Sequence, residues 1–319
     1  MAHHWPLPSP PSHTTLLIVT SIFCLTSLTS VTLRFYARKL ARLDLCADDW
    51  FALAALILTL TYNATLLSGT SHDIIANYTP THLTSTTTPE AKKYQLALQL
   101  LEILSLGLIK LCFFTLWKRV FITHPIRHLC SILIITILLW MIAFLLATIF
   151  QCGTHVSRIW MDADPTTTAS CTNGGTTQLT IYALTDLITN ILITLIPVPI
   201  IWSLRMYVVK KVGMVVLYGV GIYLTAISIA RTYMTLIIIH TTTNRPFMEN
   251  FGVLVLWAAI EINVGVVVCC VTVVLRGVRE VRAEKRKKEF HVLSGVGPKK
   301  YVVRGVGGRD KDGDGDGDD

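Results

Sequence analysis

Five charged side chains stand within long apolar stretches of this sequence. The five are Glu102, Lys110, Asp186, Arg231 and Glu261. A charge near the centre of a membrane helix costs at least ~2.5 kcal/mol, so such groups persist only when they pair with one another or reach water. Their types and positions therefore indicate either a buried binding site or a set of buried ties between helices.

We expect an outer polar layer of three carboxylates and one guanidinium. The direction in which each helix crosses the membrane places these four groups in the outer half or near the midplane. An amide four residues after Asp186 lies on the same helical face and joins them. The candidate ligand-binding or helix-tying residues are Glu102, Asp186, Asn190, Arg231, Glu261 and Asn263.

We expect an inner polar layer around Lys110. This lysine lies about 10 Å from the inner end of its helix at a rise of 1.5 Å per residue. Asp48 and Asp49 begin the neighbouring apolar stretch at that level. Pairing of Lys110 with one of these two carboxylates is the expected arrangement.

The outer layer suits a cationic or hydrogen-bonding ligand, or a proton relay. The alternative is a closed tie between helices, because interhelical polar contacts are common in membrane bundles. A metal centre is not expected. The ten histidines are scattered, and only His124 and His128 are four apart, with Pro125 between them in a loop. We predict no catalytic residue and no metal ligand.

Seven apolar stretches must position these residues. The chain is 52% hydrophobic and 15% charged, with a mean hydropathy of +0.56, which is too apolar for a water-soluble globule. Stretches of about 20 apolar residues predict membrane-spanning helices. The fold class is therefore an all-α, seven-transmembrane helix bundle. The predicted spans are 14–33, 50–69, 95–117, 129–150, 177–203, 212–239 and 251–275.

Lys and Arg residues predict the orientation. The segments after the first, third and fifth spans and the tail to Lys288 hold 17 of them, and the opposite side holds four. Because positive charge favours the cytosolic side, the N-terminus is predicted outside and the C-terminus in the cytosol. The first stretch lacks a preceding basic segment, which favours a retained span over a cleaved signal peptide.

Two features of the outer loops agree with this orientation. Asn77-Tyr78-Thr79 is a glycosylation sequon in the second loop, whereas a second sequon at Asn63 lies inside a span and should be unreachable. Cys152 and Cys171 share one outer loop. The other six cysteines lie in spans or near the cytosolic face, so this pair is the one expected disulfide.

Three regions follow along the chain. Residues 1–13 form an extracellular segment, 14–276 the transmembrane domain, and 277–319 a cytosolic tail. Residues 276–290 are basic and suit either binding to anionic lipids or a simple topology anchor. The Gly- and Asp-rich end is predicted to be disordered from its composition. Its spaced aspartates resemble the start of a calcium loop, but the closing Glu of such a loop does not follow, so we predict no metal site there.

An ordered set of motifs resembles the fungal rhodopsin-like domain family, integral membrane proteins of filamentous fungi. The resemblance covers nearly everything from Arg34 to Arg276. Its motifs are RFYAR at 34–38, DDW at 48–50, LIKLCFFTLWKRVF around Lys110, PVPIIWSLRM after Asn190, Gly221 with Arg231, and EINVG at 261–265. The paired outer-loop cysteines fit as well. The chain departs from the family pattern at Cys112, at the exchanged Asp186 and Asn190, and near Thr272, where the family has proline.

The family name suggests retinal, but the residues argue against it. A retinal Schiff base needs a lysine amine, retinal proteins place it on the last span, and 251–275 contains no lysine. We therefore expect a receptor-like protein that senses an external or metabolite ligand without retinal and without enzymatic activity. It lacks the Asp-Arg-Tyr and Asn-Pro-x-x-Tyr signatures of common G-protein-coupled receptors.

Two alternatives remain open, a transporter or proton-coupled carrier and a membrane metalloenzyme. Relatives are sometimes encoded beside secondary-metabolite enzymes, which is compatible with handling of a metabolite. We expect no cofactor and no nucleic-acid partner. The expected partners are the lipid bilayer, anionic lipids at 276–290, a small ligand and a cytosolic protein, and the expected location is the plasma membrane.

Overall fold

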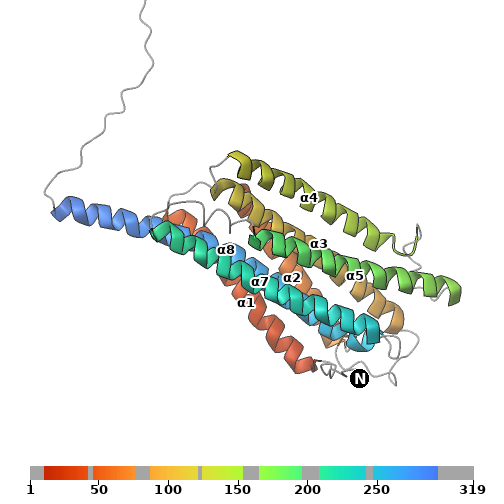
Figure 1. Ribbon diagram of the computed structural model, residues 1–319. Coiled ribbons are helices and arrows are strands. Elements are labelled where there is room, and N and C mark those ends of the chain that lie inside the picture. Colours follow the sequence, from red (N-terminus) through yellow and green to blue (C-terminus); the bar gives the residue numbers. More distant parts are fainter. Residues whose placement is uncertain are drawn as a thin grey trace, which may run out of the picture. The chain divides into compact units, whose positions relative to one another are not determined.

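A computed structural model describes most of the hydrophobic part of the chain. It covers residues 11–41, 46–72, 74–75, 87–120, 124–153, 165–195, 208–241 and 247–293. The described residues form helices and contain no strand (Figure 1). The helices are α1 (His13–Leu40), α2 (Ala47–Ser71), α3 (Thr87–Val120), α4 (His124–Ile149), α5 (Pro165–Leu195), α7 (Val208–Thr241) and α8 (Phe247–Leu293).

Each of these seven helices is long and apolar enough to cross a membrane. The prediction of an all-α seven-helix bundle is confirmed. Helix α1 continues beyond the predicted end at residue 33 to Leu40 and so carries Arg34 and Arg38 within the helix. The predicted end of the fifth span at residue 203 lies outside the described residues, because α5 is described to Leu195.

The bundle has two ends. We call the end where α1 and α3 begin the N-terminal end. The end where α1 and α3 finish is the basic end, because the last turns of these helices carry Arg38, Lys39, Lys118 and Arg119. The basic end is the one predicted to face the cytosol, and that orientation stays a prediction.

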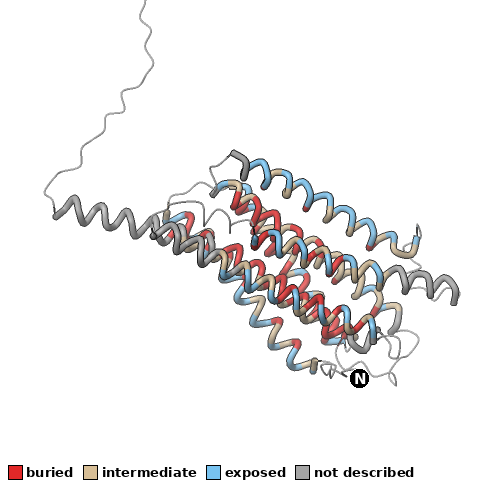
Figure 2. The backbone as a smooth tube through the Cα atoms, viewed as in Figure 1, coloured by how far each residue is buried: buried red, intermediate tan, exposed pale blue. Residues whose placement is uncertain are grey.

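Helices α3 and α8 lie at the centre of the bundle. More than half of the membrane-spanning window is buried in each, at 56% and 65%, compared with 11% in α4 (Figure 2). α3 packs against α2 and α4, and α5 packs against α7. The outward side chains of α1 and α4 are mostly apolar, which suits contact with lipid tails. The polar side chains of α3 and α8 are therefore held away from lipid.

A close approach joins the two central helices. A Cβ atom at Gly265 of α8 would lie 3.1 Å from Ile109 Cδ1 of α3, so a larger residue here would require the Ile109 side chain to move by a few tenths of an ångström. One turn further toward the basic end, a disulfide links Cys112 of α3 to Cys269 of α8. The expectation of a single disulfide in the outer loops is therefore wrong. Sequence position placed both cysteines in spans, but it could not show that they face each other.

The outer-loop predictions remain open. Cys152 is disulfide-bonded, but the side chain of Cys171 lies outside the described residues, so the pairing of the two stays a prediction. The sequon at Asn77 also lies outside the described residues. Asn63 is fully buried in α2, which agrees with the expectation that a glycosylating enzyme cannot reach it.

The helix α8 continues without a break to Leu293. The chain divides into two units after Val278, and the described part of the second unit, 279–293, is helical and contains most of the basic segment 276–290. The Gly- and Asp-rich end, 294–319, lies outside the described residues.

Candidate functional site

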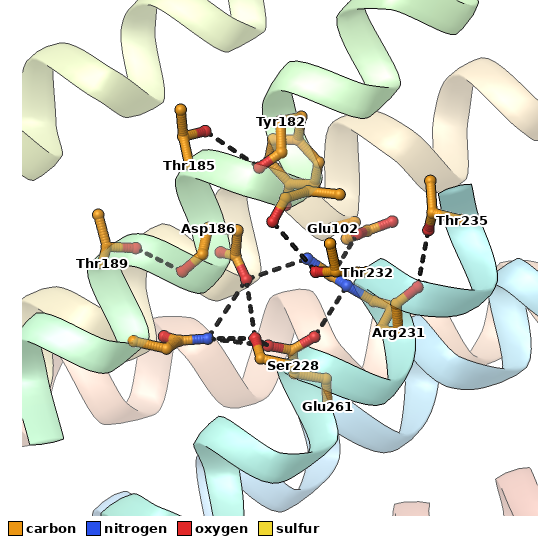
Figure 3. Close-up of polar contacts among 12 residues, drawn as sticks. Glu102, Tyr182, Thr185, Asp186, Thr189, Ser228, Arg231, Thr232, Thr235 and Glu261 are labelled. Atoms are coloured by element: carbon orange, nitrogen blue, oxygen red, sulfur yellow. Dashed lines mark hydrogen bonds and ion pairs between the residues drawn. The ribbon is translucent and has the colours of Figure 1, made fainter. Parts of the chain in front are cut away.

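Arg231 of α7 binds three carboxylates from three other helices. Its Nη1 atom lies 2.6 Å from Glu102 Oε1 of α3, and its Nη2 atom lies 3.0 Å from Asp186 Oδ2 of α5. Its Nε atom lies 2.9 Å from Glu261 Oε2 of α8. Figure 3 shows these side chains pointing toward one another. The predicted meeting of the four residues of the outer layer is therefore observed.

Lys110 joins the same group. Its ammonium lies 2.6 Å from Asp186 Oδ1 and 3.2 Å from the Asp186 carbonyl oxygen, and it also donates to the Thr189 hydroxyl. The predicted pairing of Lys110 with Asp48 or Asp49 is wrong. Side chains on a helix point back toward its N-terminus, and α3 begins at the N-terminal end. The long lysine side chain therefore reaches toward Asp186 and away from the basic end.

An amide and a hydroxyl bridge two of the carboxylates. Asn190 Nδ2 donates to Asp186 Oδ2 at 3.3 Å and to Glu261 Oε1 at 3.0 Å. Ser228 Oγ donates to Glu261 Oε1 at 2.5 Å and lies 3.3 Å from Asp186 Oδ2. Asn190 was among the predicted site residues, whereas Ser228 was not. Its position three residues before Arg231, on the same helical face, was the available signal.

Aromatic rings form one wall of the group. The Arg231 guanidinium carbon lies 5.6 Å from the centre of the Tyr182 ring, and Lys110 Nζ lies 5.0 Å from the Trp140 ring. The two rings stack on each other with centres 5.4 Å apart. Rings placed this way attract cations through their negative faces. Both positive charges of the group thus meet carboxylates on one side and an aromatic ring on another.

We call these five ionisable residues the charge cluster: Glu102, Lys110, Asp186, Arg231 and Glu261. Four of the five side chains are at most 4% exposed, and Glu102 is 14% exposed. With every group ionised, three negative charges face two positive ones. The cluster therefore carries one surplus negative charge where charge is costly.

A second ionic group lies at the basic end, and its four buried members balance in charge. Arg119 of α3, which is 38% exposed, also lies 3.8 Å from Asp48 Oδ1. Arg34 Nη2 lies 2.6 Å from Asp48 Oδ2, and Arg34 Nε lies 2.8 Å from Asp49 Oδ1. Arg38, one turn later on α1, contacts the same two carboxylates at 2.5 and 2.7 Å. We call this group the α1–α2 clamp. It contains the two aspartates of the predicted inner layer, but with α1 arginines in place of Lys110.

Asn263 belongs to neither ionic group. It exchanges hydrogen bonds with Asn63 of α2 at 3.0 and 3.2 Å, and it accepts one from Ser27 of α1 at 2.8 Å. Its inclusion with Glu261 in one site is wrong. Positions two apart on a helix point about 200° away from each other, that is, to opposite sides. Asn263 therefore ties α8 to α1 and α2.

A small cavity adjoins the charge cluster on the side of the basic end. Its volume is about 30 Å³, which is room for one or two water molecules. Polar residues at one part of the wall are Lys110, Asn190, Thr194 and Glu261. Most of the remaining wall is apolar or aromatic and includes Phe113, Trp117 and Leu224. The cavity links α3, α5, α7 and α8, the four helices that supply the cluster.

Comparisons with known proteins agree with the motifs found in the sequence. The model of the fungal rhodopsin domain matches residues 33–279. The polyenoic acids biosynthesis gene cluster protein Ba17b of Metarhizium anisopliae is 24% identical over 206 residues, which cover 63% of this chain and 54% of that protein. The chain thus spans about half the length of this relative. No solved structure matches the chain.

Proposed function

This chain belongs to the fungal rhodopsin domain family, and on that premise we propose that it is a receptor-like membrane sensor in which the charge cluster is the responsive element. A ligand would enter from outside and change how α3, α5, α7 and α8 pack. The basic end would carry that change to a cytosolic partner. The proposal includes neither enzymatic activity nor retinal chemistry.

The surplus negative charge of the cluster is the observation that carries the proposal. A purely structural tie is most stable when its buried charges balance, as those of Arg34 and Arg38 with Asp48 and Asp49 do in the α1–α2 clamp. The cluster instead holds three carboxylates against Lys110 and Arg231. A ligand can shift an equilibrium between two packings only through a difference in its affinity for them. A buried surplus charge provides such a difference for any cationic ligand.

The side chains favour a cationic or hydrogen-bonding metabolite as the ligand class. Glu102 is the partly exposed member of the cluster, and α3 runs from the N-terminal end through Glu102 toward Lys110. A ligand arriving from the N-terminal end would therefore meet Glu102 first. The name of the relative Ba17b places that protein in a biosynthetic gene cluster, which supports a small metabolite as the sensed compound.

The position of Lys110 supports the absence of retinal chemistry from this proposal. A Schiff base requires a neutral lysine amine that is free to attack an aldehyde. Lys110 is instead a buried donor with three oxygen acceptors, one of them the Asp186 carboxylate. An absorbance spectrum recorded after incubation with retinal tests this part of the proposal. A visible band that Lys110→Met removes would overturn it.

Distance measurements between two helices test the sensor proposal. Spin-labelled amino acids would replace Leu129 of α4 and Tyr223 of α7, which are both exposed. The full chain would be measured in lipid nanodiscs with an alkylammonium added, and with an alkyl carboxylate of equal chain length as the comparison. We expect the alkylammonium to shift the distance distribution and the carboxylate to leave it unchanged.

The matched control is Asp48→Asn, which removes a buried carboxylate outside the cluster. Its labelled form should still respond to the alkylammonium, whereas labelled Asp186→Asn should not. A distribution that no probe shifts in the unmodified chain would reject the sensor proposal.

A proton-coupled carrier is the second candidate, because a surplus carboxylate can also be neutralised by a proton. The cavity supports this alternative, since it gives Glu261 a space for water on the side of the basic end. Uptake of a radiolabelled alkylammonium into proteoliposomes at two pH values separates the candidates. Uptake that depends on pH and is lost in Glu261→Gln favours the carrier, whereas a distance change without uptake favours the sensor.

A further inference from the structure

We propose that the cavity beside Glu261 is a binding site for one small monovalent metal cation of about the size of sodium. A regulatory role of this ion at the charge cluster rests on the proposed sensor function. Binding itself does not require that the protein be a sensor. Three features support such a site: the charge of the cluster, the volume of the cavity and the oxygen atoms that line it.

The charge of the cluster determines the charge of the occupant. Glu102, Asp186 and Glu261 face Lys110 and Arg231 within one connected group. One added positive charge balances this group, and a divalent cation would leave it with a surplus positive charge. Charge balance should affect the stability of the protein strongly, because an uncompensated charge inside a bundle that lies in lipid costs much free energy.

The Glu261 carboxylate supplies an oxygen with unused accepting capacity. Its Oε1 atom accepts from Asn190 and Ser228. Its Oε2 atom faces Arg231 Nε at 2.9 Å but accepts no hydrogen bond, although the side chain is only 1% exposed. Buried carboxylate oxygens are normally hydrogen-bonded. A cation in the adjoining cavity, which Glu261 lines, would give this carboxylate a second cationic partner besides Arg231.

Two neutral oxygens complete the ligand set. The Asn190 Nδ2 atom, with two hydrogens to donate, lies within hydrogen-bond distance of Asp186, Ser228 and Glu261, and its Oδ1 atom accepts none from the described part of the chain. Thr194 Oγ1 donates to the Asn190 carbonyl at 3.0 Å and lies 2.9 Å from the Thr225 hydroxyl, which leaves one lone pair for a ligand. Both residues line the cavity with Glu261. One carboxylate with neutral oxygens suits a hard cation.

Lys110 does not compete for this position. Its three ammonium hydrogens have three acceptors, which are two oxygens of Asp186 and the Thr189 hydroxyl. The volume of about 30 Å³ accommodates a sodium ion with one water molecule, by comparison with the ~10–15 Å³ that one water needs by the same measure. A drug-sized molecule would need ten times as much space.

The bound ion would also regulate the sensor. A cation that neutralises the cluster lowers its attraction for a cationic ligand that reaches Glu102 from the N-terminal end. The ion and the ligand would therefore weaken each other's binding by the same factor. Sodium should thus raise the alkylammonium concentration needed for the distance change described above.

Thermal unfolding of the full chain in nanodiscs tests the ion site. The salt would be sodium, lithium, potassium or choline chloride at constant ionic strength and constant pH. We expect sodium to raise the unfolding temperature by several degrees in a saturable way relative to choline. Glu261→Gln should abolish this difference, and Thr194→Val should shift its midpoint to higher sodium concentration.

Thr136→Val is the matched control for Thr194→Val. Thr136 is an exposed residue of α4 whose hydroxyl donates to the Ile132 carbonyl, so the same substitution there should leave the sodium effect unchanged. Equal unfolding temperatures in sodium and choline would overturn the inference and indicate that a proton balances the cluster. An equal sodium effect in Glu261→Gln would also overturn it. A sodium effect without any alkylammonium-induced distance change would retain the ion site and reject the sensor.

Discussion

Lys110 Nζ lies 2.6 Å from Asp186 Oδ1, and this ion pair joins α3 to α5 near the middle of the bundle. Asp186 also contacts Arg231 at 3.0 Å through its other carboxylate oxygen. The two cations of the charge cluster therefore meet at one carboxylate. Asp186 connects the Lys110 side of the cluster to the Arg231 side.

Loss of the Lys110 charge should destabilise the protein strongly. Lys110→Met removes one of two cations and leaves Asp186 with one fewer partner, so we expect a loss of about 3–5 kcal/mol in the free energy of unfolding. Denaturant unfolding in mixed micelles measures it. Lys39→Met, at an exposed position of α1, is the control and should change little. A loss below about 1 kcal/mol for Lys110→Met would contradict the ion pair.

The sequence predicted the number of helices and the depth of the charged side chains in the membrane. It predicted less well which neighbour each side chain faces. Glu102, Asp186, Arg231 and Glu261 were expected at one level, and they meet. Depth follows from counting residues at a fixed rise. Which neighbouring helix a side chain contacts depends on how the helices pack against one another. A single sequence does not give that packing.

The errors share this cause. Arg34 and Arg38 were counted as loop charges after the first span, although their spacing of four places both on one helical face. They form ion pairs with Asp48 and Asp49 at the basic end. These ion pairs, together with the tilt of the Lys110 side chain toward the N-terminal end, explain why Lys110 does not pair with Asp48 or Asp49.

The α1–α2 clamp should be structural. Arg34→Met leaves two buried aspartates with less compensation and removes the 2.8 Å hydrogen bond from Arg34 Nη1 to the Cys269 carbonyl. We expect a loss of about 3–5 kcal/mol in the free energy of unfolding. At a temperature where the variant is folded, its alkylammonium-induced distance change should match that of the unmodified chain. A folded variant without that change would assign the clamp a role in sensing.

The pair formed by Asn63 and Asn263 should respond differently to single and double substitution. Asn263→Leu leaves the buried Asn63 amide without its partner, at a cost of about 1–3 kcal/mol. Replacing both asparagines by leucine removes both polar groups, so the double variant should be more stable than Asn263→Leu alone. Unfolding free energies measure this, and simple additivity of the two single losses would contradict a direct pair.

Glycosylation should report the orientation of the N-terminal end. Asn77→Gln should abolish the glycosidase-sensitive mobility shift of the protein expressed in a eukaryotic host, because the loop after α2 is predicted to face the lumen. Asn63→Gln should leave the shift unchanged, since Asn63 is 0% exposed. A protein that carries no glycan on Asn77, together with a protease-protected basic tail in sealed vesicles, would reverse the predicted orientation.

Removing one carboxylate from the charge cluster should be tolerated, and removing two should not. Glu102→Gln keeps an oxygen that can accept from Arg231 Nη1, which lies 2.6 Å from Glu102 Oε1, and it leaves two negative charges against two positive ones. We expect a change below about 1 kcal/mol in the free energy of unfolding.

The double variant Glu102→Gln with Glu261→Gln leaves Asp186 alone against two cations. Its loss should exceed the sum of the single losses by more than about 1 kcal/mol, because neighbouring charges in one network are not independent. The pair Asp48→Asn with Glu261→Gln is the control, since its two sites belong to separate ionic groups and should add. If Glu102→Gln alone cost as much as Lys110→Met, the cluster would hold no surplus charge, and the basis of both proposals would be removed.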